Sequence, residues 1–187
     1  ITGATGLCGS ILSTGLTKLG YKIISCDINS NPSNAAKSLN ISTNQKIKII
    51  DLRNMSQVIR ATKGISAVIH FGGIPRHKPK EDNYKNIIDH NIIGTYNVFE
   101  ASRINKVKRI IFASSAHVIG YHNRRNKLDE TCELRPDSHY AVSKCFGESL
   151  ARLYADKYNI KSMSIRVGSA LPKPTDHRFL STWISFR

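Results

Sequence analysis

The hydrophobic positions of the chain alternate between short continuous runs and runs spaced three or four residues apart. The continuous runs predict strands at Tyr21–Asp27, Lys46–Leu52, Ala67–Phe71, Arg109–Ala113 and Ser162–Val167, and Ile1 is expected to end another strand. The helical spacing predicts helices at Leu7–Leu19, Ser56–Thr62, Tyr84–Ser102 and Tyr140–Tyr158. We expect loops after Asp27, between Ala113 and Ser138, and after Val167.

This alternation of strands and helices predicts an α/β fold with a mainly parallel, doubly wound sheet of the Rossmann type. The first strand is central in such a sheet, whose strand order is 3-2-1-4-5-6. Only Ile1 remains of that strand, and no helix cap or polar tail precedes Arg187. We therefore expect a chain that is cut at both ends and poorly stable by itself.

The chain has 187 residues and a formal net charge of +15, which raises the question of a nucleic-acid partner. The Lys and Arg residues are scattered along the sequence, so we expect no nucleic-acid role. Cys8, Cys26, Cys132 and Cys145 form no CxxC pair, and no Cys/His spacing suits a metal. Free thiols in the cytoplasm are expected, and no apolar run reaches the length of a membrane span.

A glycine-rich loop stands between the expected first strand and the first helix. Gly3, Gly6 and Gly9 allow a tight turn whose backbone N–H groups can approach a pyrophosphate, while the helix from Leu7 directs its positive dipole end there. Asp27 ends the next strand, where a carboxylate accepts hydrogen bonds from ribose hydroxyls and repels a 2′-phosphate. The loop therefore predicts NAD binding, although Asp27 could also have a purely structural role at the strand end.

Further candidate cofactor contacts follow the next two strands, because open α/β sheets bind ligands at the carboxyl ends of their strands. Asp51 and Leu52 could meet the adenine edge. Gly72 and Gly73 allow a second close approach of the backbone to the cofactor.

Tyr140 and Lys144 are four residues apart on a predicted helix and therefore share one face. A tyrosine is a poor base at neutral pH, and a nearby ammonium group lowers its pKa by favouring the phenolate. Ser115 follows the preceding strand and can hydrogen-bond the reacting oxygen. Asn91 could hold a water molecule beside the lysine or could equally be a surface asparagine.

Together these features resemble an extended short-chain dehydrogenase/reductase of the NAD-dependent epimerase/dehydratase superfamily over nearly the whole chain. The segments Phe112–Gly120, Arg135–Tyr140, Ser143–Glu148, Pro172–Arg178 and Ser181–Trp183 more narrowly resemble uronate dehydrogenase. That family oxidises galacturonate or glucuronate with NAD to an aldarolactone. The resemblance implies a partial NAD-binding domain over residues 1–187, with residues 168–187 beginning the substrate-binding region.

The same resemblance implies roles for individual residues. Tyr140 would take the proton of the anomeric hydroxyl, Lys144 would support Tyr140 and the nicotinamide ribose, and Ser115 would orient the sugar oxygen. Arg178 would hold the substrate carboxylate, Ser169 a sugar hydroxyl, and His117 would shape the pocket. The alternatives are a solvated loop charge for Arg178 and a hydrogen-bonded loop histidine for His117. It also suggests a homo-oligomer that pairs through its two long helices.

Two positions depart from the family pattern. Ala116 stands where the family usually has Asn, and Pro75 stands where it usually has Ser. Both positions would touch sugar hydroxyls, so the sugar itself is open. Alternatives are a dehydrogenase of another sugar, a nucleotide-sugar epimerase or dehydratase, or a non-catalytic NAD sensor.

Overall fold

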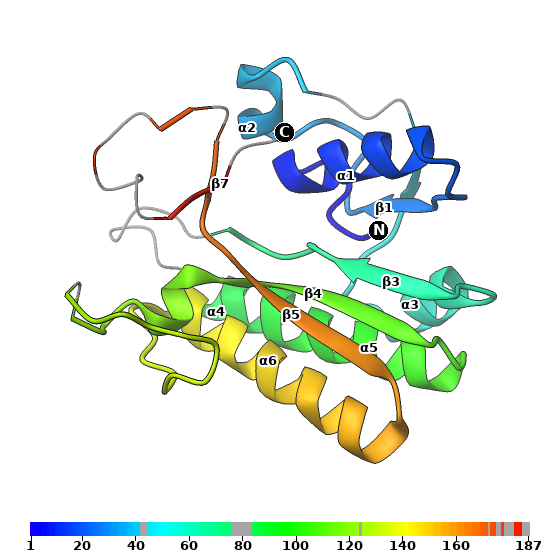
Figure 1. Cartoon of the computed structure of the whole chain (residues 1–187). Coiled ribbons are helices and arrows are strands. Elements are labelled where there is room, and N and C mark those ends of the chain that lie inside the picture. The colour runs from blue at the N-terminus through cyan, green and yellow to red at the C-terminus, as the bar shows by residue number, and fades with distance from the viewer. Residues whose placement is uncertain are drawn as a thin grey trace.

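The computed structural model describes residues 1–41, 45–75, 84–123, 125–171, 173–174, 177 and 182–184 (Figure 1). Its strands are β1 (Ser25–Asp27), β2 (Ile47–Ile49), β3 (Ala67–His70), β4 (Arg109–Ser115), β5 (Lys161–Val167), β6 (Ser169–Ala170) and β7 (Trp183–Ile184). Its helices are α1 (Leu7–Lys18), α2 (Asn34–Ser38), α3 (Met55–Thr62), α4 (Tyr84–Ile87), the π-helix η2 (Ile88–Ile93), α5 (Gly94–Ile104), the 3₁₀ helix η3 (Ala116–Ile119) and α6 (His139–Tyr158).

The main sheet is parallel throughout its described pairings, which confirms the predicted α/β fold. β1 pairs with β2, and β4 pairs with both β3 and β5. Thr2 joins the two halves through parallel bridges to Cys26 and His70. The order β2–β1–Thr2–β3–β4–β5 is that of a Rossmann sheet, with Thr2 at the place of the central first strand.

Helices cover the two faces of this sheet. Figure 1 shows α5 and α6 below the strands β3 to β5, and α1 on the opposite side. α3 packs against α5, so it belongs to the lower layer. Ser138 is the N-cap of α6, and its side chain accepts a hydrogen bond from the Ala141 amide; Asn159 is the C-cap, in the left-handed conformation.

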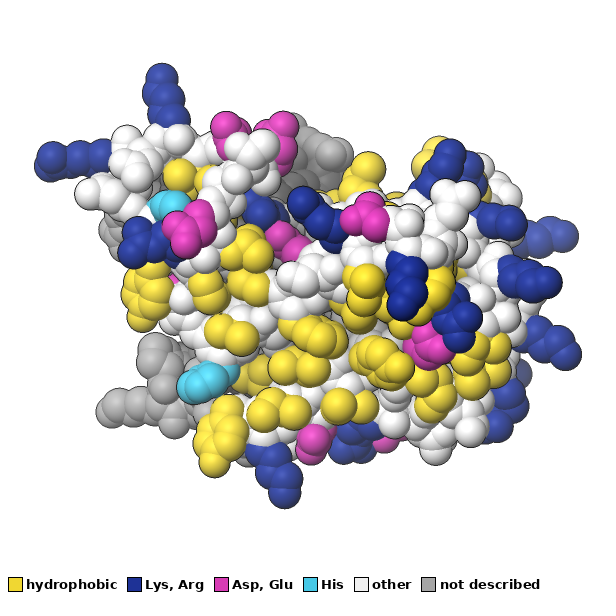
Figure 2. All heavy atoms as spheres, turned by 90° about the horizontal axis from the view of Figure 1, so that it is seen from below, with side chains coloured by type: hydrophobic (Ala, Val, Ile, Leu, Met, Phe, Trp, Pro, Cys, Tyr) yellow, Lys and Arg dark blue, Asp and Glu magenta, His cyan; other side chains and the backbone are white. Residues whose placement is uncertain are grey.

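The outer face of the lower helices is strongly apolar. Figure 2 looks onto this face and shows hydrophobic side chains gathered across its centre. Exposed large hydrophobic residues of these helices are Tyr84, Ile88, Ile93, Tyr96, Ile104, Val142, Leu153 and Tyr158. In the described part of the chain, no helix combines the length and the apolar content that crossing a bilayer requires.

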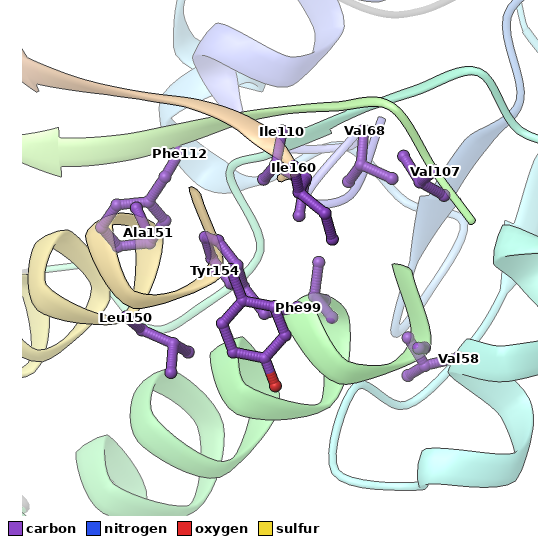
Figure 3. Packing of buried hydrophobic residues seen from close by; sticks show 12 residues of the cluster. Val58, Val68, Phe99, Val107, Ile110, Phe112, Leu150, Ala151, Tyr154 and Ile160 are labelled. Atoms are coloured by element: carbon purple, nitrogen blue, oxygen red, sulfur yellow. The ribbon is translucent and has the colours of Figure 1, made fainter. Parts of the chain in front are cut away.

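The core lies between the sheet and this helical layer (Figure 3). Phe99 of α5 packs edge-on against Phe112 of β4 and Tyr154 of α6, with ring centroids 6.4 and 5.4 Å apart. Val98, Phe99 and Ile110 are fully buried. α6 approaches β4 most closely at Gly147, where an added Cβ atom would overlap the Phe112 ring.

Several predicted elements differ in extent. The segment after Asp27, expected to be a loop, contains α2, because the Ser33 side chain caps the short helix at the Ala36 amide. The tail after Val167, also expected to be a loop, forms the parallel pair β6–β7. β1 and β2 are both shorter than the predicted Tyr21–Asp27 and Lys46–Leu52, because their parallel pairing extends only over Ser25–Asp27 and Ile47–Ile49.

Two local features were not anticipated from the sequence. The predicted long helix from Tyr84 contains the π-helical turn η2, and its last turn extends to Ile104. The 3₁₀ helix η3 follows β4 directly, where the Ser115 hydroxyl accepts a hydrogen bond from the His117 amide. Both features lie where the helices and strands approach the candidate site.

The Gly147→Ala variant is expected to be less stable by about 1–3 kcal/mol, because the new methyl group must push α6 away from Phe112. Urea denaturation measures this difference. Gly15→Ala is the matched control: Gly15 lies in α1 with nothing near the added atom, so this variant should gain about 0.5–1 kcal/mol. A Gly147→Ala protein as stable as the unchanged one would contradict the close approach.

Candidate active site

A cleft of about 970 Å³ opens at the carboxyl ends of the parallel strands. This is the size and the location expected of a ligand site in an open α/β sheet. Its lining brings together eleven of the predicted site residues: Gly3, Gly6, Leu7, Gly9, Asp27, Asp51, Leu52, Gly72, Gly73, Tyr140 and Lys144. Asn91, Ser115, His117 and Ser169 are not among its described lining residues.

The glycine loop is shaped by close backbone contacts. Gly3 has a φ of +67°, and a Cβ atom there would come within 2.7 Å of the Phe71 carbonyl carbon. Gly6 is the N-cap of α1 and contributes no side chain to cap the first turn. The backbone amides at the start of α1 therefore face the cleft with the positive end of the helix dipole, as an anion site requires.

Asp27 ends β1 and Asp51 lies two residues after β2, and the two carboxylates have different surroundings. The Asp27 carboxylate accepts hydrogen bonds from Thr5 and from the Ile28 amide. Asp51 forms an ion pair with Arg53, with a distance of 2.6 Å between Oδ2 and Nη2. Hydrogen bonding from Arg53 lowers the pKa of the Asp51 carboxyl group.

Buried polar side chains hydrogen-bond the backbone of the second glycine loop, residues 72–74. The Gly72 amide donates to Thr2 Oγ1 over 3.1 Å, and Thr2 Oγ1 lies 2.7 Å from Nδ1 of His70. Asn91, which is 2% exposed, accepts from the Ile74 amide over 2.7 Å and donates to the Ile74 carbonyl over 3.0 Å. The asparagine side chain thus positions the loop backbone.

Asn91 also connects this loop to the helix that carries Tyr140. Its Nδ2 donates to the Ser143 hydroxyl over 3.2 Å, and that hydroxyl donates to the Tyr140 carbonyl over 2.6 Å. The predicted role of Asn91, holding a water molecule beside Lys144, remains a prediction. The described contacts show it as a link between the Ile74 backbone and α6.

Tyr140, Lys144 and Ser115 come together at the junction of β4 and α6. The Tyr140 phenol shares a hydrogen bond with the Ser115 side chain. Lys144 Nζ lies 5.5 Å from the centroid of the Tyr140 ring and 5.0 Å from that of Phe112. The predicted helical spacing therefore places the hydroxyl, the phenol and the amine in one small region.

Burial is the largest cause of the pKa shifts of Lys144 and Tyr140. Burial lowers the pKa of Lys144 to about 8. Burial also raises the pKa of Tyr140, and the hydrogen bond with Ser115 offsets part of that effect. This direction differs from the expected lowering of the tyrosine pKa by the lysine, because loss of hydration disfavours the charged forms of both groups.

Two of the three residues predicted to contact the sugar besides Ser115, namely His117 and Ser169, lie in the described part of the chain. His117 packs edge-on against Tyr140, with ring centroids 6.3 Å apart, and its Nδ1 lies 2.7 Å from Asp137 Oδ2. The Ser169 hydroxyl lies 3.0 Å from that of Thr182. Arg178 lies outside the described residues.

Three residues with close contacts to the site were not singled out from the sequence: Asp137, Thr5 and His70. His70 is fully buried, which lowers its pKa to about 3, and its Nε2 lies 3.0 Å from the Thr95 hydroxyl. A histidine inside the apolar run Ala67–Phe71 was the available signal. Within the described ranges, no three His, Cys, Asp or Glu side chains gather closely enough to hold a metal ion.

Residues 1–185 match the sequence profile described as the NAD dependent epimerase/dehydratase family. The chain belongs to this family. The extended short-chain dehydrogenase resemblance is therefore confirmed. It rested on the glycine loop, Asp27, the segment Asn91–Ala101, Ser115 and the Tyr140/Lys144 pair.

Individual relatives narrow the comparison within the family. The chain is 37% identical to the uronate dehydrogenase of Pseudomonas syringae pv. tomato over 186 residues, which cover 100% of this chain and 64% of that protein. The solved structure of a glucuronic acid dehydrogenase from Chromohalobacter salexigens matches with a TM-score of 0.86 and 38% identity, covering 99% of this chain and 65% of that one. The chain thus spans slightly less than two thirds of these relatives.

A third relative was solved with a ligand. The structure of a uronate dehydrogenase from Agrobacterium tumefaciens complexed with NAD matches with a TM-score of 0.85 and 36% identity. The match covers 98% of this chain and 65% of that one. Both solved relatives confirm the Rossmann fold of this chain.

The Lys144→Met variant is expected to be more stable than the unchanged protein at pH 7. The unfolded chain binds a proton at Lys144 near its ordinary pKa of 10.5, but the folded protein binds it only near 8, so stability rises with pH between these values. Removing the amine should therefore stabilise the fold by up to roughly 3 kcal/mol below pH 8, and the gain should vanish above pH 10.5.

Urea denaturation at a series of pH values measures this effect. Lys157→Met, at an exposed position of the same helix, is the control and should change stability little. If the free energy of unfolding of the Lys144→Met variant depends on pH as that of the unchanged protein does, Lys144 is hydrated in the folded protein.

Proposed function

We propose that the whole protein is an NAD-dependent dehydrogenase that oxidises the anomeric carbon of a uronic acid to an aldarolactone. The observation that carries the proposal is that Tyr140 and Lys144 both line the cleft and that Tyr140 shares a hydrogen bond with the Ser115 side chain. It occurs in a chain that is 37% identical, over its entire length, to a uronate dehydrogenase.

The chain's own residues fit NAD. Gly3 and Gly9 keep the turn open at positions where any Cβ atom would collide with backbone, and the uncapped start of α1 provides amides for the pyrophosphate. Asp27 provides the ribose acceptor, and the described cleft residues 28–35 carry no Lys or Arg to neutralise a 2′-phosphate. When bound, NAD accepts the hydride from the anomeric carbon.

The residues of the chain supply the proton transfer. Tyr140 takes the proton of the anomeric hydroxyl in its phenolate form, which burial disfavours and the hydrogen bond with Ser115 favours, while the Ser115 hydroxyl orients the same sugar oxygen. Loss of the O–H proton and of the C–H hydride turns the anomeric C–OH into the carbonyl of the lactone. Lys144 Nζ lies 5.5 Å from the centroid of the Tyr140 ring, and its pKa of about 8 suits it to exchange a proton with Tyr140 through solvent near neutral pH.

The substrate end is proposed from the family resemblance. We propose that residues 168–187 begin the substrate region, in which Arg178 pairs bidentately with the uronate carboxylate and Ser169 contacts a sugar hydroxyl. His117 lies against Tyr140 and would flank the sugar. Pro75 lines the cleft where the family usually has a polar residue, and Ala116 follows Ser115, so we expect a changed preference among uronates.

The direct test offers galacturonate, glucuronate, galactose and glucose to the whole protein, each with NAD and with NADP. Reduction of NAD by a uronate is expected, with kcat/KM for the neutral sugar roughly 10–100-fold lower because the charge-assisted contact to Arg178 is lost. The absorbance of the reduced cofactor follows the reaction.

The same panel, extended by one uridine-diphosphate sugar, also separates the alternatives. If only a neutral sugar is oxidised, the protein is a dehydrogenase but a uronic acid is not its substrate. Interconversion of a nucleotide sugar, without net reduction of NAD, would replace the proposal with an epimerase. The Arg178→Ala variant should lose the preference for uronates while retaining turnover of the neutral sugar.

We further propose that the protein forms a homodimer through the exposed apolar face of α5 and α6 seen in Figure 2. A contiguous exposed apolar face of this kind commonly marks a protein interface. A twofold dimer uses the same surface of both copies. Leu153 of α6 and Tyr96 of α5 in one copy would therefore pack against α5 and α6 of the other copy.

Leu153→Glu is expected to convert the dimer into a monomer, because a carboxylate is costly to bury in an apolar interface. Light scattering after size-exclusion chromatography reports the mass. Met163→Glu, at an exposed site on β5, is the control and should leave the dimer intact. An unchanged mass for Leu153→Glu, or a monomeric unchanged protein, would contradict this interface.

The proposed compartment is the cytoplasm. All four cysteines, Cys8, Cys26, Cys132 and Cys145, carry free thiols. Reducing conditions of the cytoplasm keep thiols in this form.

A further inference from the structure

The Asp27 carboxylate is held in one orientation by the glycine loop. Its Oδ2 accepts two hydrogen bonds from Thr5, one from the backbone amide over 2.9 Å and one from the hydroxyl over 2.7 Å. Its Oδ1 accepts one hydrogen bond from the Ile28 amide over 2.7 Å. A carboxylate has about four acceptor positions, so the remaining one is on Oδ1.

Thr5 also joins the segments around this carboxylate. It is 6% exposed, and its carbonyl accepts a hydrogen bond from the Ser33 amide over 2.9 Å. Ser33 in turn caps α2. The glycine loop, the end of β1 and the start of α2 therefore meet at Thr5, and all three line the same end of the cleft.

The direction of the hydrogen bonds at Thr5 has a chemical consequence. The hydroxyl donates its single proton to Asp27, so only its oxygen lone pairs can face a ligand. One ribose hydroxyl can donate to such an oxygen, and a second can donate to Asp27 Oδ1. A phosphate dianion can donate to neither, and it would face two acceptor oxygens without a compensating proton or cation.

We propose that Thr5 is a specificity-determining residue that positions Asp27 for dinucleotides without a 2′-phosphate. The Thr5 hydroxyl and amide both donate to Oδ2 of Asp27. Oδ1 of the same carboxylate is then the oxygen that accepts a hydrogen bond from a ribose hydroxyl. This inference rests on the proposed use of NAD and adds to it the residue that sets the acceptor geometry.

The test measures the dissociation constants of NAD and NADP by isothermal titration calorimetry, with no sugar present. Thr5→Val keeps the shape of the side chain but loses the hydroxyl, and it should weaken NAD binding roughly tenfold with a smaller effect on NADP. Thr5→Ser should restore the unchanged protein's values. Thr17→Val is the matched control, since the Thr17 hydroxyl bonds only to the Ser13 carbonyl within α1.

A double-variant cycle distinguishes positioning from a general loss of structure. If Thr5 acts through Asp27, Thr5→Val should have no further effect on NAD binding in the Asp27→Ala background. Equal losses in both backgrounds, or an unchanged NAD/NADP ratio in Thr5→Val, would overturn the inference.

Binding measurements keep this inference separate from the proposed reaction. If the whole protein oxidises no uronate but Thr5→Val still weakens NAD binding as expected, the proposed reaction is wrong and the role of Thr5 in NAD binding stands. Absence of NAD binding by the unchanged protein would overturn both.

Discussion

The close packing of α6 on β4 is the contact on which the catalytic geometry depends. Phe112 fills the space beside Gly147, and the face of its ring lies 5.0 Å from Lys144 Nζ. One helical turn earlier, Tyr140 reaches Ser115 at the end of β4. The contact that attaches the helix to the sheet therefore also buries the lysine and directs the tyrosine at the cleft.

The burial that creates this geometry opposes the charges of the same groups. The pKa of Lys144 falls to about 8 and that of Tyr140 rises, so the folded protein disfavours both the ammonium and the phenolate. Buried neutral groups hold the neighbouring backbone: Thr2 and His70 at Gly72, and Asn91 at Ile74. The site thus combines a rigid polar frame with two titratable groups whose environment costs stability.

The sequence predicted what depends on local spacing. The helices after Gly6 and Ser138, the parallel strands and the residues at their carboxyl ends follow from periodicity and from glycine placement. The segment after Asp27 is rich in Asn and Ser, which favour turns and caps alike, so α2 was not predicted. Pairs such as Thr5 with Asp27 join segments 22 residues apart, and no local pattern encodes them.

The measurement that tests the central claim most directly uses galacturonate deuterated at its anomeric carbon. We expect the deuterium to accumulate at the nicotinamide ring, as seen by NMR of the reduced cofactor, and we expect Tyr140→Phe to abolish this transfer while NAD still binds. Deuterium that stays on or returns to the sugar, or transfer at an unchanged rate in Tyr140→Phe, would contradict it.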